Sequence, residues 1–226
     1  MALAEWRRSL YTGALRKGFA GKQGAVAVIY LIRHATPLID YNSCNARSAK
    51  LRLDEYNQTS SIDEAEIAAF LSQPNVSQML LASEANIMSS PVNRAYATAC
   101  RLFDVARIQQ DARLREFDLR LSNIPVLKMG LRHWFALHRI LWVLGISLGA
   151  ASRIAEHQRA LGVAAELYKI GGEAGKTTII VSHGMFLRTI RKAMQKRGMQ
   201  AHRVFRSGCF TVESLTPSAG LLGHQQ

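Results

Sequence analysis

Two short apolar runs in this chain each end at a histidine. The first, Ala25 to Ile32, leads into Arg33-His34-Ala35-Thr36-Pro37, and the second, Thr177 to Val181, leads into Ser182-His183-Gly184. Short apolar runs bounded by turn residues are typical of buried strands in a parallel sheet. The carboxyl ends of such strands form the ligand crevice of an α/β sheet. We therefore expect both histidines in one crevice.

The rest of the chain alternates between strand-like and helix-like patterns. Gly171-Gly172 is expected to end the helix before the second histidine run. Strands that alternate with helices indicate a mostly parallel sheet covered on both faces. The predicted elements in the first half are a strand at 25–33, a loop to about 62, a helix at 63–72 opened by Ser61 and Glu64 as a capping box, a strand at 85–89, a helix at 91–104 with Pro91 in its first turn, and a short strand or turn near 107–109. Those in the second half are helices at 125–145 and 151–170, a strand at 177–181, a helix at 185–197 and a strand at 209–215.

The composition is that of a globular protein with reduced thiols. The 226 residues, 48% of them hydrophobic, fit one α/β domain with an insertion. The three cysteines, Cys44, Cys100 and Cys209, match no metal-ligand or disulfide pattern, which indicates a cytoplasmic protein. The chain has no Gly-rich nucleotide loop and no metal-ligand spacing, so we expect neither a cofactor nor a metal.

The formal net charge is +13, and two segments concentrate it. Residues 1–24 form a basic arm, interpreted as mobile or helical, before a domain at 25–226. The second segment follows His183, where no acidic residue occurs between Gly184 and Val212. Such a field attracts anionic ligands. Nucleic acid and an anionic membrane stay as alternatives that we do not favour, because no aromatic residues are interleaved with the charges. The oligomeric state is left open.

The longest apolar stretch runs from Trp134 to Ala151. It contains His138 and Arg139 and is too short and too polar for a membrane span. We interpret it as a buried or lid helix, with membrane contact as the alternative.

The polar groups at the predicted strand ends have the chemistry that cleavage of a phosphate monoester requires. The reaction needs an in-line nucleophile, cations that hold the dianion and an acid for the leaving alkoxide. His34 is suited to attack because a neutral imidazole has an unprotonated nitrogen. Arg33 and Arg94 supply planar donors for the phosphoryl oxygens. A protonated His183 adds a charge-assisted hydrogen bond.

Glu116 is the candidate proton donor, because the like charge of a bound phosphate would raise the pKa of its carboxyl. Asp118, two residues further on, is an alternative. The turns after the two histidines, at Thr36 and Gly184, are expected to add backbone N–H groups for the substrate. Each of these residues alone is more often structural, so the hypothesis depends on their combination.

In their order and spacing, these motifs resemble the histidine phosphatase superfamily, the phosphoglycerate mutase-like group. Arg33-His34-Ala35 is similar to the family's Arg-His-Gly, and Arg94 is similar to its arginine inside the helix after a Ser-Pro turn. Leu114-Arg115-Glu116 is similar to its Leu-x-Glu, and Val181-Ser182-His183-Gly184 is similar to its Val-Ser-His-Gly. The resemblance runs from about residue 26 to 215.

The resemblance implies a three-layer α/β/α sandwich with a mostly parallel central sheet and a helical cap insertion, placed at about 119–150. It implies that His34 is the phosphorylated nucleophile and Glu116 the general acid and later base. Arg33, Arg94, His34 and His183 would bind the phosphate. The apolar and basic cap suggests a substrate with an anionic portion and an organic body.

Two departures from the family pattern bear on the activity. Ala35 stands where the family usually has glycine, and Thr36-Pro37 together with the absent downstream Trp-Asn disfavours a glycolytic mutase. The leading hypothesis is a metal-independent phosphomonoesterase acting on phosphorylated small molecules, in whose pocket we also expect phosphate or sulfate to bind. The alternatives are a phosphomutase of the same fold and a catalytically silent protein that binds a phosphorylated ligand.

Overall fold

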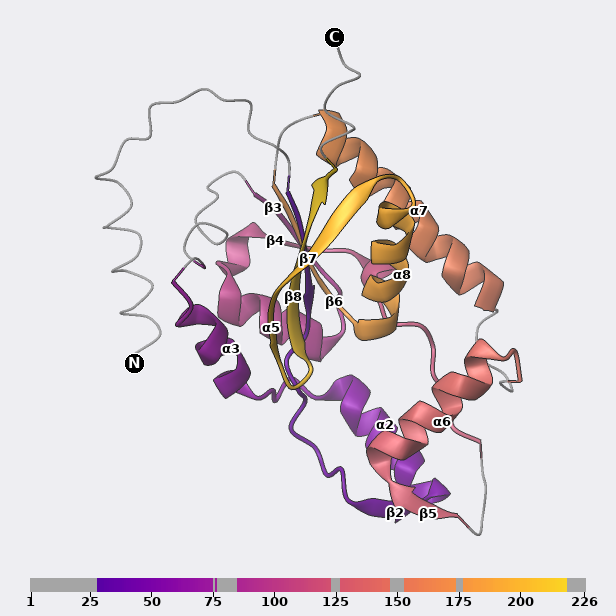
Figure 1. The fold of residues 1–226 in the computed structure, drawn as a ribbon. Coiled ribbons are helices and arrows are strands. Elements are labelled where there is room, and N and C mark those ends of the chain that lie inside the picture. The colour runs from indigo at the N-terminus through magenta and orange to yellow at the C-terminus, as the bar shows by residue number, and fades with distance from the viewer. Residues whose placement is uncertain are drawn as a thin grey trace.

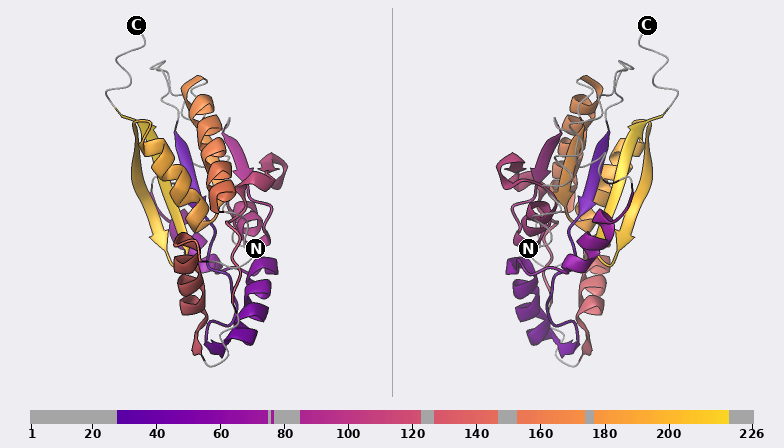
Figure 2. Two further views of the ribbon diagram at one scale, coloured as in Figure 1. Left: turned by 90° about the vertical axis from the view of Figure 1, so that its right-hand side faces the viewer. Right: turned by 90° about the vertical axis from the view of Figure 1, so that its left-hand side faces the viewer.

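A six-stranded sheet lies between two helical layers in the computed structural model, which describes residues 28–74, 76, 85–122, 127–146, 153–173 and 177–218 (Figures 1 and 2). The first four strands in spatial order run parallel to one another, and the fifth is antiparallel to the strand on each side of it. The α/β fold class with a mostly parallel sheet is therefore confirmed. In spatial order the strands are β4 (Ile108–Gln110), β3 (Asn86–Ser89), β6 (Thr178–Ser182), β1 (Ile29–Arg33), β8 (Phe210–Pro217) and β7 (Met199–Ser207).

Helices cover both faces of this sheet, which is why its central strands are continuously apolar. All five residues of β6 are buried, as expected for a strand with helices on both sides. On one face, α7 (Arg153–Glu173) and α8 (Gly184–Gln195) enclose a core that includes Leu31 and Ile180. On the other face, α3 (Glu64–Leu71) and α5 (Asn93–Leu102) enclose a second core.

A smaller unit, which we call the roof, lies beyond the carboxyl ends of the parallel strands (Figure 1). Its centre is Trp134, which is fully buried and whose indole N–H donates to the Cys44 carbonyl oxygen at 3.0 Å. The placement of a cap insertion at 119–150 stays a prediction. In the structure, residues 43–58 belong to the same unit as residues 128–143 of that segment. The roof consists of β2 (Ser43–Asn45), α2 (Ala46–Gln58), β5 (Lys128–Gly130) and α6 (Leu131–Val143).

The predicted loop up to residue 62 is wrong, because β2 and α2 occupy it. The signals of a helix are present in the sequence. Asn45 caps the helix by accepting a hydrogen bond from the Ser48 N–H, and Ala46, Ala49 and Leu53 form a buried stripe at helical spacing.

Several predicted ends also differ. Asp63, not Ser61, caps α3, because its carboxylate accepts from the Ala65 N–H. Pro91 precedes α5 instead of lying in its first turn, and Gly171-Gly172 lie inside α7. Strand β7 was not predicted: it is largely exposed and its pattern is irregular, so the alternation typical of a half-buried strand is lost. The predicted helix at 125–145 begins only at Leu131, after β5.

The basic arm at 1–24 lies outside the described residues. Within the described part of the chain, no helix combines the length and apolar character needed to cross a membrane. The stretch from Trp134 is α6 as far as Val143, and it buries Trp134, His138 and Trp142 on one face.

Candidate active site

The two histidines meet at the carboxyl edge of the sheet. Strands β1 and β6 are parallel neighbours in which Arg33 pairs with Ser182, so the next residues, His34 and His183, emerge side by side. The His34 N–H donates to the Ser182 carbonyl oxygen at 3.0 Å. The two ring centroids are 5.2 Å apart, and the two residues are 1% and 0% exposed.

Hydrogen bonds hold the His34 ring in a neutral form with one unprotonated nitrogen. Its Nδ1 lies 2.8 Å from the Ala35 carbonyl oxygen, which only accepts hydrogen bonds, so Nδ1 carries the hydrogen. Its Nε2 accepts from Arg94 Nε at 3.2 Å. Burial first, and then the charges of Arg94 and Arg33, lower the pKa of His34 well below 6.5. Near pH 7 the ring therefore keeps a lone pair on Nε2.

His183 lies beside His34 and is likewise neutral near pH 7. Its Nε2 lies 2.9 Å from Ser90 Oγ, while its buried Nδ1 has no hydrogen-bond partner among the described residues. Burial, followed by the charge of Arg94, lowers the pKa of His183 well below 6.5. The protonated His183 expected from the sequence therefore requires an anion to offset burial.

Arg94 is 2% exposed and reaches across the site from the first turn of α5. Besides His34, its Nη1 donates to the Tyr56 carbonyl oxygen at 3.0 Å and to Asn57 Oδ1 at 3.2 Å. Its guanidinium carbon lies 4.3 Å from the Tyr56 ring centroid, within cation–π range. Arg94 therefore joins the sheet edge to the roof.

Arg33 lies on the other side of the histidines. Its Nη2 lies 3.6 Å from Cys209 Sγ, and its buried Nε has no partner among the described residues. A Cβ at Gly184 would lie 3.1 Å from that Nε, so a larger residue at 184 would press on Arg33.

Glu116 is fixed at the start of α8. Its Oε1 accepts from the Phe117 and Phe186 N–H groups at 3.0 and 3.1 Å, and its Oε2 accepts from the Met185 N–H at 3.3 Å. These bonds use two free N–H groups of the helix N-terminus. Arg139 Nη2 of the roof lies 4.0 Å from Oε2, and Arg139 Nη1 is buried without a partner among the described residues.

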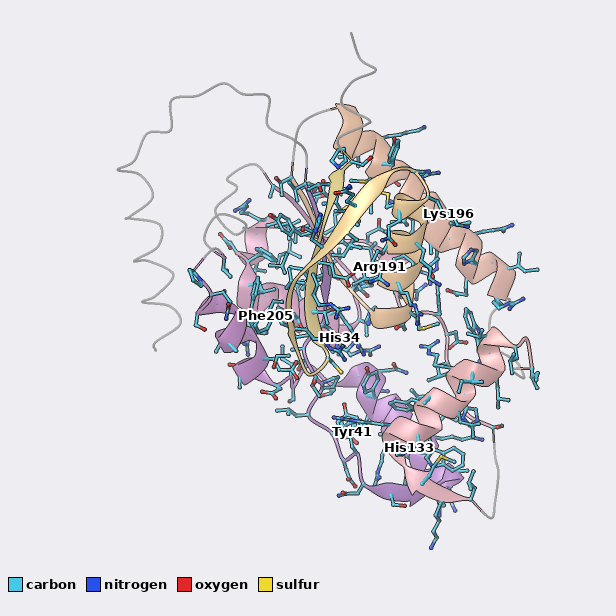
Figure 3. All side chains as sticks on the ribbon, viewed as in Figure 1. His34, Tyr41, His133, Arg191, Lys196 and Phe205 are labelled. Carbon is cyan, nitrogen blue, oxygen red and sulfur yellow. The ribbon has the colours of Figure 1, made fainter. Side chains whose placement is uncertain are left out.

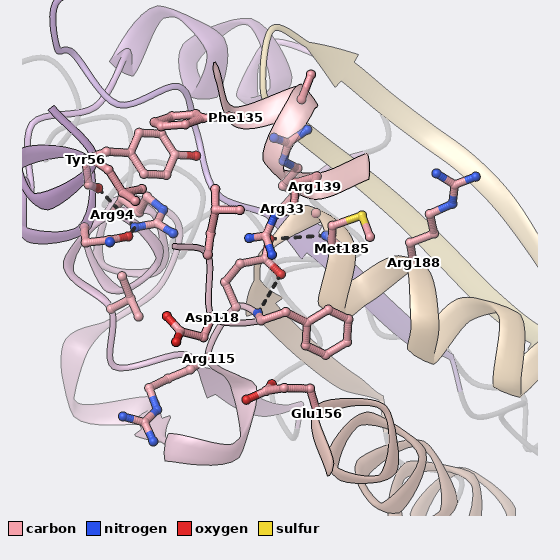
Figure 4. Close-up of a pocket in the computed structure, with 18 of the residues that line it drawn as sticks. Arg33, Tyr56, Arg94, Arg115, Asp118, Phe135, Arg139, Glu156, Met185 and Arg188 are labelled. Carbon is pink, nitrogen blue, oxygen red and sulfur yellow. Dashed lines mark hydrogen bonds and ion pairs between the residues drawn. The ribbon is translucent and has the colours of Figure 1, made fainter. Parts of the chain in front are cut away.

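These groups surround a cavity of about 700 Å³ between sheet edge and roof (Figure 4). Arg33 and Arg139 both line this cavity, and Tyr56 and Phe135 lie together at one end of it (Figure 4). The two aromatic ring centroids are 5.2 Å apart, and the Tyr56 ring lies 6.2 Å from that of His34. His34 and His183 are not among the residues that line this cavity, but His34 contacts Arg94, which does line it. We call the buried polar group of His34, Ser90, Arg94 and His183 the floor.

Of the remaining predicted site residues, Gly184 and Asp118 line the cavity, whereas Thr36 does not. The Thr36 hydroxyl donates to Glu66 Oε1 at 2.6 Å and accepts from the Cys209 N–H at 3.0 Å. Glu66 is 6% exposed and also accepts from the Thr36 and Phe210 N–H groups. Thr36 therefore ties the loop after β1 to the β7–β8 hairpin.

The sequence analysis missed the contributions of Tyr56, Asn57 and Ser90. Tyr56 lies on the helical stripe of Ala49 and Leu53, so that spacing was the available signal. The Ser90 contact with His183 follows from the pairing of β3 with β6, which the sequence does not display. In the described part of the chain, no three His, Cys, Asp or Glu side chains form a group able to hold a metal ion.

A known structure of low sequence identity shares this fold, and two others are similar over most of the chain. Mycobacterial glucosyl-3-phosphoglycerate phosphatase, solved with VO3, is 18% identical, with 85% of this chain and 100% of that chain covered and a TM-score of 0.50. Phosphoserine phosphatase from Entamoeba histolytica is 16% identical (84% and 96% covered, TM-score 0.46). Phosphoglycerate mutase from Bacillus anthracis is 18% identical (77% and 83% covered, TM-score 0.44). No curated protein matches the sequence.

The family comparison covers most of the site. Residues 78–220 match the histidine phosphatase superfamily (branch 1), and this range includes Arg94, Glu116 and His183 but begins after Arg33-His34. Since the match spans more than half of the chain, the protein belongs to the histidine phosphatase superfamily.

Proposed function

We propose that this protein is a metal-independent phosphatase that hydrolyses phosphate monoesters of small molecules through a phosphohistidine on His34. The proposal rests on one observation, the protonation and hydrogen bonding of the His34 ring. Its Nδ1 donates to a backbone carbonyl, and its Nε2 keeps a lone pair between the buried guanidinium of Arg94 and the ring of His183. A neutral, oriented imidazole surrounded by cationic donors is what attack on a phosphate dianion requires.

In the first step, Nε2 of His34 attacks phosphorus in line with the ester oxygen. The P–O ester bond breaks as the N–P bond forms, and the departing alkoxide takes a proton from Glu116. Arg94 exchanges its hydrogen bond with Nε2 for bonds to the phosphoryl oxygens, and Arg33 supplies its free Nε. The charge of the bound dianion favours a proton on His183, whose Nδ1 then donates to it.

In the second step, Glu116 acts as a carboxylate. It accepts a proton from a water molecule that attacks the phosphohistidine, which releases inorganic phosphate and restores neutral His34. The three backbone N–H groups that hold Glu116 keep it at the cavity wall through both steps. The arginines provide the positive charge that a metal ion supplies in other phosphatases, which is the basis for expecting activity without one.

The test is turnover of p-nitrophenyl phosphate and a panel of phosphorylated metabolites in excess EDTA. Wild-type protein should turn over substrate and form an acid-labile phosphoenzyme, and His34→Ala should do neither. His202→Ala, which removes an exposed histidine of β7, is the matched control and should keep full activity. Loss of wild-type activity in EDTA would contradict the mechanism.

The same measurements separate the alternatives. A phosphomutase would isomerise phosphoglycerate when a bisphosphate primer is present, because the phosphoryl group would pass from His34 to a second hydroxyl instead of to water. A silent binding protein would bind phosphorylated ligands and never form a phosphoenzyme.

A further inference from the structure

A second cavity lies behind Arg33, between α8 and the β7–β8 hairpin. It has a volume of about 250 Å³ and is separate from the larger cavity, although Arg33, Gly184 and Arg188 line both. Figure 4 shows Arg188 rising from α8 toward the strands of the hairpin and away from Arg94. We call this second cavity the arginine pocket, because its lining includes Arg33, Arg188, Arg191, Arg203 and Arg206.

The strand register places these side chains on one face of the sheet. Arg33 pairs with Thr211, which pairs with Arg206, and Leu31 pairs with Glu213, which pairs with Arg203. Side chains directly opposite each other in paired strands share a face. Arg33 and Arg206 therefore lie in one row across the sheet, and Arg203 lies in the next row, all on the face covered by α8.

A β-bulge makes the arrangement of β7 possible. Arg203 and Arg206 are three residues apart, which in a regular strand would put them on opposite faces. The register shifts between Arg203 and Phe205, and Val204 is the extra residue. Both arginines consequently face α8. Phe205, labelled in Figure 3, packs on the opposite face against Phe70, with 5.4 Å between the ring centroids. Bulges of this kind re-aim side chains at sites of function.

The positive charge in the arginine pocket is not balanced within the pocket. Among the described residues that line the pocket, Glu213 is the only acidic one, against five arginines. One oxygen of Glu213 lies 2.9 Å from Arg191 Nη1 and 3.8 Å from Arg203 Nη2. The Nε atom of Arg191 is buried and has no hydrogen-bond partner among the described residues. Buried donors without partners are rare in folded proteins, and planar guanidinium groups match phosphate oxygens.

We propose that the arginine pocket is a second binding site for a phosphate group, distinct from the phosphate site at His34. Two sources supply that chemistry: a second phosphate on the same substrate, reached past Arg33 and Arg188, or a separate phosphate ligand. Only the first source rests on the proposed phosphatase function. In both cases Arg203 and Arg206 bind the anion, and neither contributes to the reaction at His34.

The first measurement is calorimetric titration of full-length protein with inorganic pyrophosphate at about 0.15 M salt, where long-range surface electrostatics are screened. The double substitution Arg203→Met/Arg206→Met should raise the Kd by about tenfold or more, because two charge-assisted hydrogen-bond donors are lost. Arg47→Met/Lys50→Met removes the same charge from exposed positions of α2 and should leave the Kd unchanged. Arg203→Lys/Arg206→Lys retains the charge without the planar fork and should give an intermediate Kd.

The second measurement compares kcat/KM for fructose 1,6-bisphosphate and glucose 6-phosphate. If the substrate spans both cavities, the methionine double variant loses about tenfold in kcat/KM for the bisphosphate only. If the ligand is separate, pyrophosphate binding weakens while both kcat/KM values stay unchanged.

An unchanged pyrophosphate Kd in a methionine double variant that unfolds at the wild-type temperature overturns the proposal. A wild-type protein that binds pyrophosphate through these arginines but hydrolyses no phosphate monoester overturns the proposed function and leaves the second site standing.

Discussion

The floor and the roof are built on different physical principles. The floor consists of polar groups less than 3% exposed, and three of them, His34, Ser90 and His183, directly follow paired parallel strands. The roof contributes the aromatic side chains of Tyr56 and Phe135 from two helices that pack against each other. We infer that the floor determines the chemistry, and that the roof determines access and affinity.

The largest effect is expected for the floor. His34→Asn keeps a polar side chain of similar size but removes the nucleophilic nitrogen, so kcat should fall by at least ~10⁴-fold. The readout is p-nitrophenyl phosphate turnover together with circular dichroism of the folded variant. A folded His34→Asn protein that retains even a tenth of wild-type kcat would contradict a role of the floor in the reaction.

Glu116→Gln should have the next largest effect. The amide oxygen still accepts from the Phe117 and Phe186 N–H groups, whereas the Met185 N–H loses its acceptor. Because the amide transfers no proton, kcat should fall by ~10²–10⁴-fold. An activated substrate such as p-nitrophenyl phosphate has a good leaving group and should suffer less than an alkyl phosphate. Equal losses for both substrates would contradict a role in protonating the leaving group. Asp118→Asn is the matched control, because Asp118 lines the same cavity and was the alternative acid.

A smaller effect is expected for the roof. Tyr56→Leu removes the ring that lies over Arg94, an interaction of about 0.5–2 kcal/mol, which corresponds to a roughly two- to thirtyfold rise in KM. The value of kcat should change little. A Tyr56→Leu variant that loses kcat as strongly as Glu116→Gln would break the distinction between floor and roof.

The smallest effect concerns stability against pH. Both floor histidines have pKa values well below 6.5 when folded, whereas in the unfolded chain they take up protons near 6.5. The unfolded state then binds more protons, so their contribution to stability is fully present above pH 6.5 and declines below it, by up to about 1.4 kcal/mol per pH unit for each histidine. Urea unfolding at pH 7.5 and 5.5 measures this slope. His183→Asn should reduce the slope, and His202→Asn should not.

The sequence predicted the floor better than the roof for a physical reason. His34 and His183 each follow a continuous apolar run, which the sequence alone identifies as a buried strand. Parallel pairing of the two strands then brings their carboxyl ends, and with them the histidines, together. Glu116 and Arg94 follow from local motifs. Tyr56 lies in a helix that the sequence analysis took for a loop, because α2 carries many charged residues between its buried positions. The β7 bulge was also not predicted. It lies next to Phe205, whose partner Phe70 is far away in the sequence.

Gly208 imposes a constraint on redesign of the hairpin. This residue has a φ of +51° at the turn between β7 and β8, and any Cβ placed there would collide with the carboxylate of Glu66. The collision would reach the Thr36 loop that follows His34, because Glu66 holds that loop. If the hairpin is exchanged to alter ligand preference, position 208 therefore has to stay glycine. Libraries should randomise Val204 and its neighbours while holding Gly208 fixed.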